Sequence, residues 1–100
     1  MPQAIPSGWT QAGNALTRTF ARADFVEALA LVLEIGKLSE AANHHPDLDI
    51  RYRTVHLSLS THDAGHTVTG KDFSLAREIN DLSEDAIRLT SDELRRRFEA

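Results

Sequence analysis

The chain has 100 residues with 41% hydrophobic and 26% charged content, which is ordinary for one globular domain that buries roughly 60–70% of its unfolded surface. Its 15 acidic and 11 basic residues give a formal charge of −4, which disfavours direct nucleic-acid binding because that needs a basic surface. No apolar run approaches the roughly 20 residues of a membrane span, and the sequence has no leader pattern and no cysteine, so we expect a cytoplasmic protein without disulfides or membrane contact.

The amino-terminal part is predicted to form a β-hairpin after a loose lead-in. Residues 1–8 contain two prolines and a glycine, which oppose regular structure. Strands are expected over Trp9–Ala12 and Ala15–Phe20, because Gly13 and Asn14 between them tolerate the positive φ of a tight turn.

The clearest helix is expected from Asp24 to about Asn43. Asp24 is a good amino-terminal cap, and six apolar residues recur behind it at helical spacing: Phe25, Ala28, Leu29, Val32, Leu33 and Ile35. The residue before a proline is driven out of the α region, so His45-Pro46 should end this helix. His44 and His45 would then lie at its carboxyl end, where the helix dipole favours positive charge.

A second hairpin and a second helix are predicted to follow. Strands are expected over Leu48–Tyr52 and Val55–Thr61, since apolar and polar residues alternate along the latter. Thr69-x-x-Asp72 is a variant capping box for a helix that continues to about Asp81.

A final helix is predicted over Ser91–Glu99, with Thr90-x-x-Glu93 as its capping box. The elements therefore follow the order ββαββα, with one additional helix at the carboxyl end. This order indicates an α+β fold, in which an antiparallel sheet carries helices on one face.

Histidines gather in two segments that this fold can bring together. His44 and His45 end the first long helix, and His62 follows the last strand, so a hairpin that folds back would place all three around one pocket. An imidazole can give and take a proton at neutral pH, and a positioned acid–base group contributes roughly 10²–10⁴ in rate. Glu40 precedes His44 by four residues and can orient or charge that imidazole, and Tyr52 is expected on the neighbouring strand.

Three other interpretations of these residues stay open at this point. The paired histidines can simply cap the helix dipole. His44, His45, His62 and Asp63 suit zinc or iron, although no HxxxH or HxH spacing is present. Ser58 or Ser60 can form a nucleophilic triad with His62 and Asp63, but no nucleophile elbow surrounds either serine.

The spacing of these residues resembles that of the pterin-4a-carbinolamine dehydratases. The resemblance extends from about Trp9 to Leu82 and rests on Glu40-x-x-x-His44-His45-Pro46, Tyr52, Thr61-His62-Asp63 and Asp72. It implies a four-stranded antiparallel sheet, edge-to-edge dimers and helix-mediated tetramers. The implied reaction removes water from a 4a-hydroxytetrahydropterin, such as 4a-hydroxytetrahydrobiopterin. It uses no metal or organic cofactor.

The resemblance also implies a role for each residue of the site. His44 and His62 would carry protons, His45 would hold the pterin, and Glu40 would support the imidazoles. Asn43, Pro46 and Asp63 would occupy substrate-binding positions in the same pocket.

The sequence departs from the family pattern at two places. The loop after His62 is one residue longer than usual and carries His66. The family's amino-terminal helix is missing, and a similar segment, "LTSDELRRRFEA", stands at the other end. We therefore divide the chain into a lead-in (1–8), a dehydratase-like domain (9–82), and a linker with a carboxyl-terminal helix (83–100). Our hypothesis is that this helix takes the place of the missing one.

The same fold also serves non-catalytic relatives. The resemblance includes a dimerisation partner of a homeodomain transcription factor and an assembly chaperone for Rubisco, so a binding module is the alternative function. The retained His44-His45 pair favours the enzyme.

Overall fold

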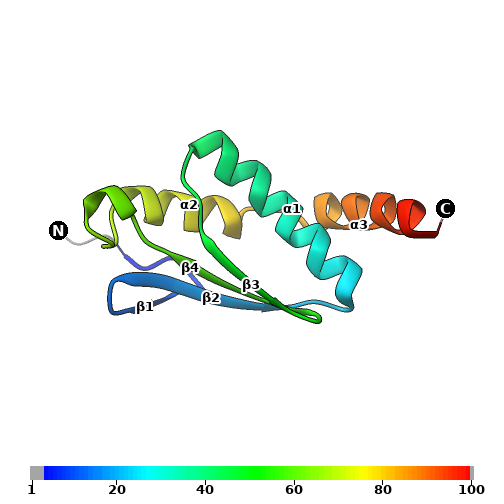
Figure 1. Ribbon diagram of the computed structural model, residues 1–100, viewed down its shortest axis with the longest axis horizontal. Helices are drawn as coiled ribbons and strands as arrows, with labels where there is room; N and C mark the ends of the chain where they lie inside the picture. The colour runs from blue at the N-terminus through cyan, green and yellow to red at the C-terminus, as the bar shows by residue number, and fades with distance from the viewer. Residues whose placement is uncertain (1–3, 100) are drawn as a thin grey trace.

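Four antiparallel strands form one sheet in the order β1-β2-β4-β3, and helices α1 and α2 lie across one of its faces (Figure 1). The computed structural model describes residues 4–99. Its elements are β1 (Thr10–Ala12), β2 (Ala15–Ala21), α1 (Phe25–Ala42), β3 (Asp47–Arg51), β4 (Thr54–Leu59), a 3-10 turn η1 (His62–Ala64), α2 (Gly70–Asn80) and α3 (Glu84–Glu99). The predicted α+β fold with a four-stranded antiparallel sheet is confirmed.

The hydrophobic core lies between the sheet and the two helices that cover it. Val55, Leu57 and Leu59 of β4 are fully buried, as the period of two predicts, and they face the buried side chains of α1 and α2. The intervening His56 lies on the uncovered face, where its Nδ1 is 2.6 Å from Oγ1 of Thr19. Within residues 4–99, the helices thus cover one face of the sheet and leave the other uncovered.

The hairpin between β3 and β4 reverses one residue earlier in the chain than predicted. Strand β3 ends at Arg51, which pairs with Thr54, so Tyr52 is in the connecting turn rather than on the strand. Tyr52 has φ 55° and is 68% exposed. The prediction of a strand through Tyr52 was wrong because a two-residue reversal needs left-handed backbone that an aromatic residue does not signal.

Helix α3 begins seven residues earlier than predicted. Ser83 accepts a hydrogen bond from the Ala86 backbone N–H at 3.0 Å and caps the helix. Thr90 is inside the helix, where its hydroxyl donates to the buried Glu34 carboxylate of α1 at 2.9 Å. The predicted capping box at Thr90 was therefore wrong, since tertiary contact with α1 uses that side chain.

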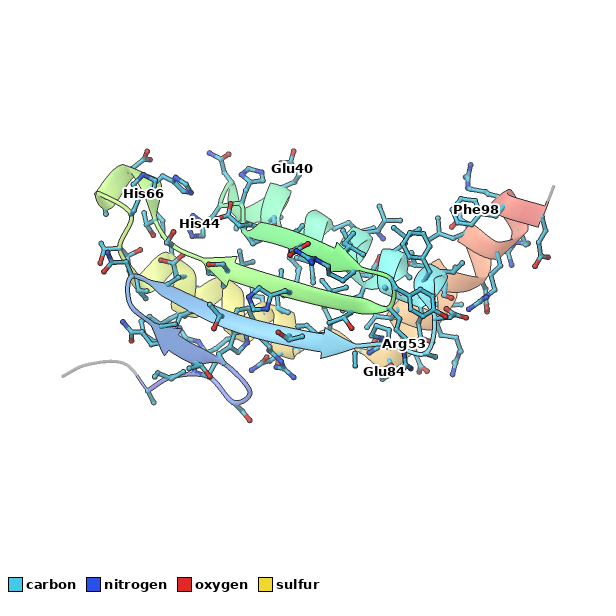
Figure 2. The ribbon with its side chains drawn as sticks, turned by 60° about the horizontal axis from the view of Figure 1, so that its bottom comes forward. Glu40, His44, Arg53, His66, Glu84 and Phe98 are labelled. Atoms are coloured by element: carbon cyan, nitrogen blue, oxygen red, sulfur yellow. The ribbon has the colours of Figure 1, made fainter. Side chains whose placement is uncertain are left out.

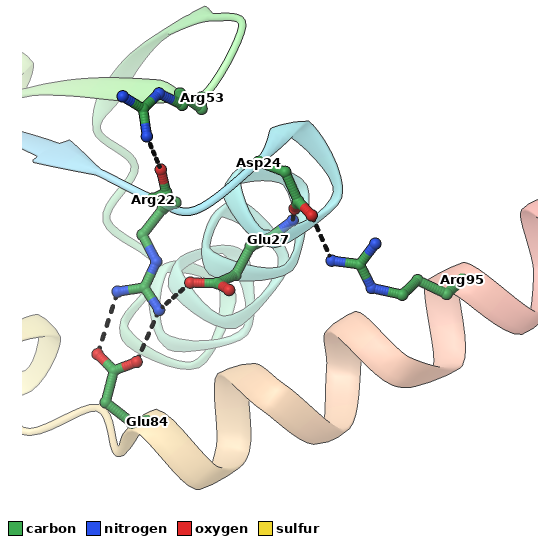
Figure 3. Close-up of polar contacts among 6 residues, drawn as sticks. All are labelled: Arg22, Asp24, Glu27, Arg53, Glu84 and Arg95. Atoms are coloured by element: carbon green, nitrogen blue, oxygen red, sulfur yellow. Dashed lines mark hydrogen bonds and ion pairs between the residues drawn. The ribbon is translucent and has the colours of Figure 1, made fainter.

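Charged groups join α3 to the beginning of α1 (Figure 3). Both terminal nitrogens of Arg22 donate to Glu84, at 3.0 and 2.7 Å, and Arg22 also pairs with Glu27 at 2.7 Å. Asp24, the cap of α1, accepts a hydrogen bond from Arg95 at 2.7 Å. Helix α3 thus packs mainly against α1 and extends past the end of the sheet (Figure 1).

The ion pair between Arg22 and Glu84 predicts a pH-dependent contribution to stability. The hydrogen bonds from Arg22 lower the pKa of Glu84 from its ordinary value of 4.5. A lowered folded-state pKa stabilises the fold above pH 4.5, and this contribution is lost as the pH falls through the lowered value. Because the Glu84 side chain is 75% exposed, the effect should not exceed about 1 kcal/mol.

Urea denaturation of wild type and Glu84→Gln measures this effect. The wild type should be the more stable protein at pH 7, and the difference should disappear at low pH. Asp85→Asn is the matched control, because its ion pair with Arg88 lies within α3 and joins the helix to nothing else. Equal stability of wild type and Glu84→Gln at pH 7 would contradict the prediction.

Candidate active site

A polar pocket of about 330 Å³ lies where the end of α1 meets the segment that follows β4. Its lining comes from three segments of the chain: Asn43, His44, His45, Pro46 and Asp47, then Thr61, His62 and Asp63, then Lys71. His44 and His66 are at the same end of the molecule, and Phe98 of α3 is at the other (Figure 2). The structure thus brings together every residue given a role in this site from the sequence except Glu40, which contacts the lining residue His45.

The backbone turn at the end of α1 sets the directions of the paired histidines. Asn43 adopts the left-handed conformation, with φ 49° and ψ 44°. The His44 N–H donates to the Ser39 carbonyl at 3.0 Å, and the Asn43 N–H donates to the Glu40 carbonyl at 3.2 Å, which is a Schellman motif. The helix therefore ends at Ala42, and His44 and His45 both lie beyond it.

His44 is fixed by a buried carboxylate. Its Nε2 is 2.6 Å from Oδ1 of Asp72, which is fully buried at the start of α2. The other oxygen of Asp72 accepts from the Thr61 hydroxyl and from the Thr69 backbone N–H, both at 2.8 Å. Because a carboxylate accepts hydrogen bonds, Nε2 of His44 carries a proton, and in the neutral ring Nδ1 is then the acceptor atom.

The sequence pointed to Asp72 as a helix-capping residue and as part of the family spacing, but gave it no role in the site. The capping box with Thr69 is present, so that prediction is confirmed. The bond to His44 was missed, because it joins residues 28 positions apart and has no local pattern. Lys71 was also missed; it lines the pocket because it occupies the first turn of α2 beside Asp72.

Glu40 contacts His45 rather than His44. Nε2 of His45 forms a short hydrogen bond with the Glu40 carboxylate. The expected pairing with His44 was wrong, because the left-handed Asn43 interrupts the helix and removes the four-residue spacing that places two side chains on one face. Both partners are more than half exposed, so this pair orients a ring of the pocket lining and contributes little to the stability of the fold.

His62 and Asp63 belong to η1, which forms a second wall of the pocket. Tyr52 does not reach this wall, because it follows the far end of β3, about 17 Å along the strand from the pocket residue Asp47. Across residues 4–99, no three His, Asp or Glu side chains are grouped closely enough to hold a metal ion. Nor does any helix in that range have the length and apolar character of a membrane span.

The chain is thus a small α+β domain with a histidine-lined pocket at one end of its sheet. A family model described as "Pterin 4 alpha carbinolamine dehydratase" matches residues 1–82. A protein of Roseiflexus castenholzii with the name "Putative pterin-4-alpha-carbinolamine dehydratase" is 54% identical over 76 residues, which are 76% of this chain and 81% of that protein. The chain belongs to the pterin-4a-carbinolamine dehydratase family, and α3 lies outside the matched part.

Two solved structures share the fold. One, titled "transcriptional coactivator/pterin dehydratase" and from Brucella melitensis, is 33% identical with a TM-score of 0.69, over 74% of this chain and 80% of that one. The other is described as a pterin dehydratase-like protein identified as a RuBisCO assembly factor in the alpha-carboxysome. It is 18% identical with a TM-score of 0.62, over 74% of this chain and 87% of that one, and so resembles this chain in fold alone.

Proposed function

We propose that the protein dehydrates a 4a-hydroxytetrahydropterin to the quinonoid dihydropterin during pterin recycling. The observation that carries the proposal is the meeting of His44 and His62, from two distant segments, at one polar pocket of about 330 Å³. A pocket of this size is at the lower end of the range for small-molecule sites, which suits a flat bicyclic ring. The family to which the chain belongs supports the same reaction.

The reaction breaks the C4a–O bond and the N5–H bond and releases water, so it needs one proton donor and one proton acceptor. We assign the acceptor role to Nδ1 of His44, because Asp72 holds the proton on Nε2 and its carboxylate offsets the positive charge that the ring gains. His62, which lines the same pocket from η1, would protonate the leaving hydroxyl.

The remaining pocket residues are proposed to hold the substrate. His45, oriented by Glu40, would bind the pterin ring, and Asn43, Pro46 and Asp63 would complete the lining. The family further implies a homodimer or homotetramer in the cytoplasm. The domain division at residues 8 and 82, with α3 in place of an amino-terminal helix, also remains a prediction.

A non-catalytic binding role is the second candidate. It is favoured by the structural relative whose title includes "transcriptional coactivator", and by α3, a helix that the family model does not cover. Such a role needs neither His44 nor His62, whereas the dehydratase needs both.

A stopped-flow assay of purified protein separates the two candidates. Enzymatically generated 4a-hydroxytetrahydropterin dehydrates spontaneously, and the protein should accelerate the appearance of quinonoid dihydropterin in proportion to its concentration. A rate equal to that of the uncatalysed reaction, from protein shown to be folded by circular dichroism, would leave the binding role as the better account.

A further inference from the structure

The loop after β4 carries a fourth histidine next to the pocket. The Thr61 N–H donates to the Thr67 carbonyl at 2.8 Å, and the His66 N–H donates to the Thr61 carbonyl at 3.1 Å, so the loop closes on itself. His66 has φ 58°, a left-handed conformation that turns the chain back toward η1. The loop thereby brings the ring of His66 against the ring of His62.

The two imidazoles meet edge to face. Their ring centroids are 4.4 Å apart, and their planes form an angle of 68°. Edge-to-face contact is the favoured arrangement of aromatic rings, because the positive edge of one faces the negative face of the other. The contact therefore favours one orientation of the His62 ring over others.

The three imidazoles of the pocket are held in different ways. Asp72 binds His44, and Glu40 binds His45. For His62, no hydrogen bond or ion pair of the side chain is found among residues 4–99, where its ring contact is with His66. His66 does not itself line the pocket, so any effect that it has on the substrate must pass through His62.

We propose that His66 is a positioning residue, which holds the ring of His62 in the orientation that delivers a proton into the pocket. This inference rests on the proposed dehydratase function. It goes beyond that function by assigning a role to the longer loop of this chain, which supplies an aromatic partner where the other two imidazoles have a carboxylate.

The test uses two substitutions of His66 in the full chain. His66→Asn removes the ring but tolerates the left-handed backbone, and His66→Phe restores a ring edge. His66→Asn should lower kcat about three- to tenfold with little change in KM, because a reacting group that is poorly oriented slows the chemical step. His66→Phe should recover most of the loss, and the control His56→Asn, on the uncovered face of the sheet, should match wild type.

A double-mutant cycle shows whether the effect passes through His62. In a His62→Ala background, His66→Asn should cause no further loss of kcat, because the group that it positions is gone. As a single substitution, His66→Asn should also shift the NMR signals of the carbon-bound ring protons of His62, because these lie close to the His66 ring.

Each outcome has one meaning. Wild-type kcat in His66→Asn, or an equal loss in the His62→Ala background, would overturn the inference while the dehydratase function stands. If wild type fails to accelerate dehydration, or His62→Ala retains full activity, the proposed function fails and this inference fails with it. Unchanged ring-proton signals of His62 in His66→Asn would overturn the contact itself.

Discussion

Replacing either His44 or His62 with alanine is expected to lower kcat for dehydration by about 10²–10⁴-fold, the usual contribution of one acid–base group. Each substitution removes one of the two proposed proton carriers that line the pocket. His44→Ala removes a ring that is almost wholly covered, so its thermal unfolding must be checked beside its activity. His62 is exposed, and His62→Ala should unfold at the wild-type temperature.

His56→Ala is the matched control for both variants. It also removes an imidazole, but from the uncovered face of the sheet, and its activity should equal that of wild type. The double variant His44→Ala/His62→Ala should lose less than the product of the two single losses, since the two groups act in one step. Near-wild-type turnover in both single variants would contradict the proposed acid–base roles of His44 and His62.

Asp72 is expected to affect both stability and activity, and two substitutions separate these effects. Asp72→Ala removes the capping box of α2 and leaves the Thr61 hydroxyl without its buried acceptor, which should cost about 2–4 kcal/mol of unfolding free energy. Asp72→Asn keeps an oxygen for these two donors. It presents an amide donor to His44, however, and a donor there forces the proton of the ring onto Nδ1.

Urea denaturation and stopped-flow assays on the two variants test this division. Asp72→Asn should lose activity by one order of magnitude or more while it retains most of its stability, because the acceptor atom of His44 is now protonated. Asp72→Ala should lose both. If Asp72→Asn is fully active, Asp72 is a structural cap only, and the assignment of Nδ1 of His44 as the acceptor is wrong.

Local signals in the sequence were sufficient for most of the fold. Asp24 and Thr69 cap their helices as predicted, because a cap depends on the few residues that follow it. The alternation along β4 placed Val55, Leu57 and Leu59 in the core for the same reason. Predictions that failed depended on partners distant in the chain or on a local reversal of the backbone.

The carboxylate partners of the paired histidines show this limit most clearly. Spacing alone assigned Glu40 to His44, but the left-handed Asn43 reassigns Glu40 to His45. Asp72, the actual partner of His44, becomes visible only when α2 packs beside the end of α1. The predicted capping box at Thr90 failed for the same reason, since the partner of Thr90, Glu34, is 56 residues away in the chain.

The molecule is elongated, with extents of 50 × 23 × 21 Å, and this shape separates the histidine pocket from α3. The histidine pocket opens at one end, and α3 with Phe98 projects at the other (Figure 2). A macromolecule that bound α3 would leave the pocket accessible to small molecules. Tethering the chain to a bead or a fluorophore through its last turn is therefore a practical way to watch turnover without blocking small molecules from entering.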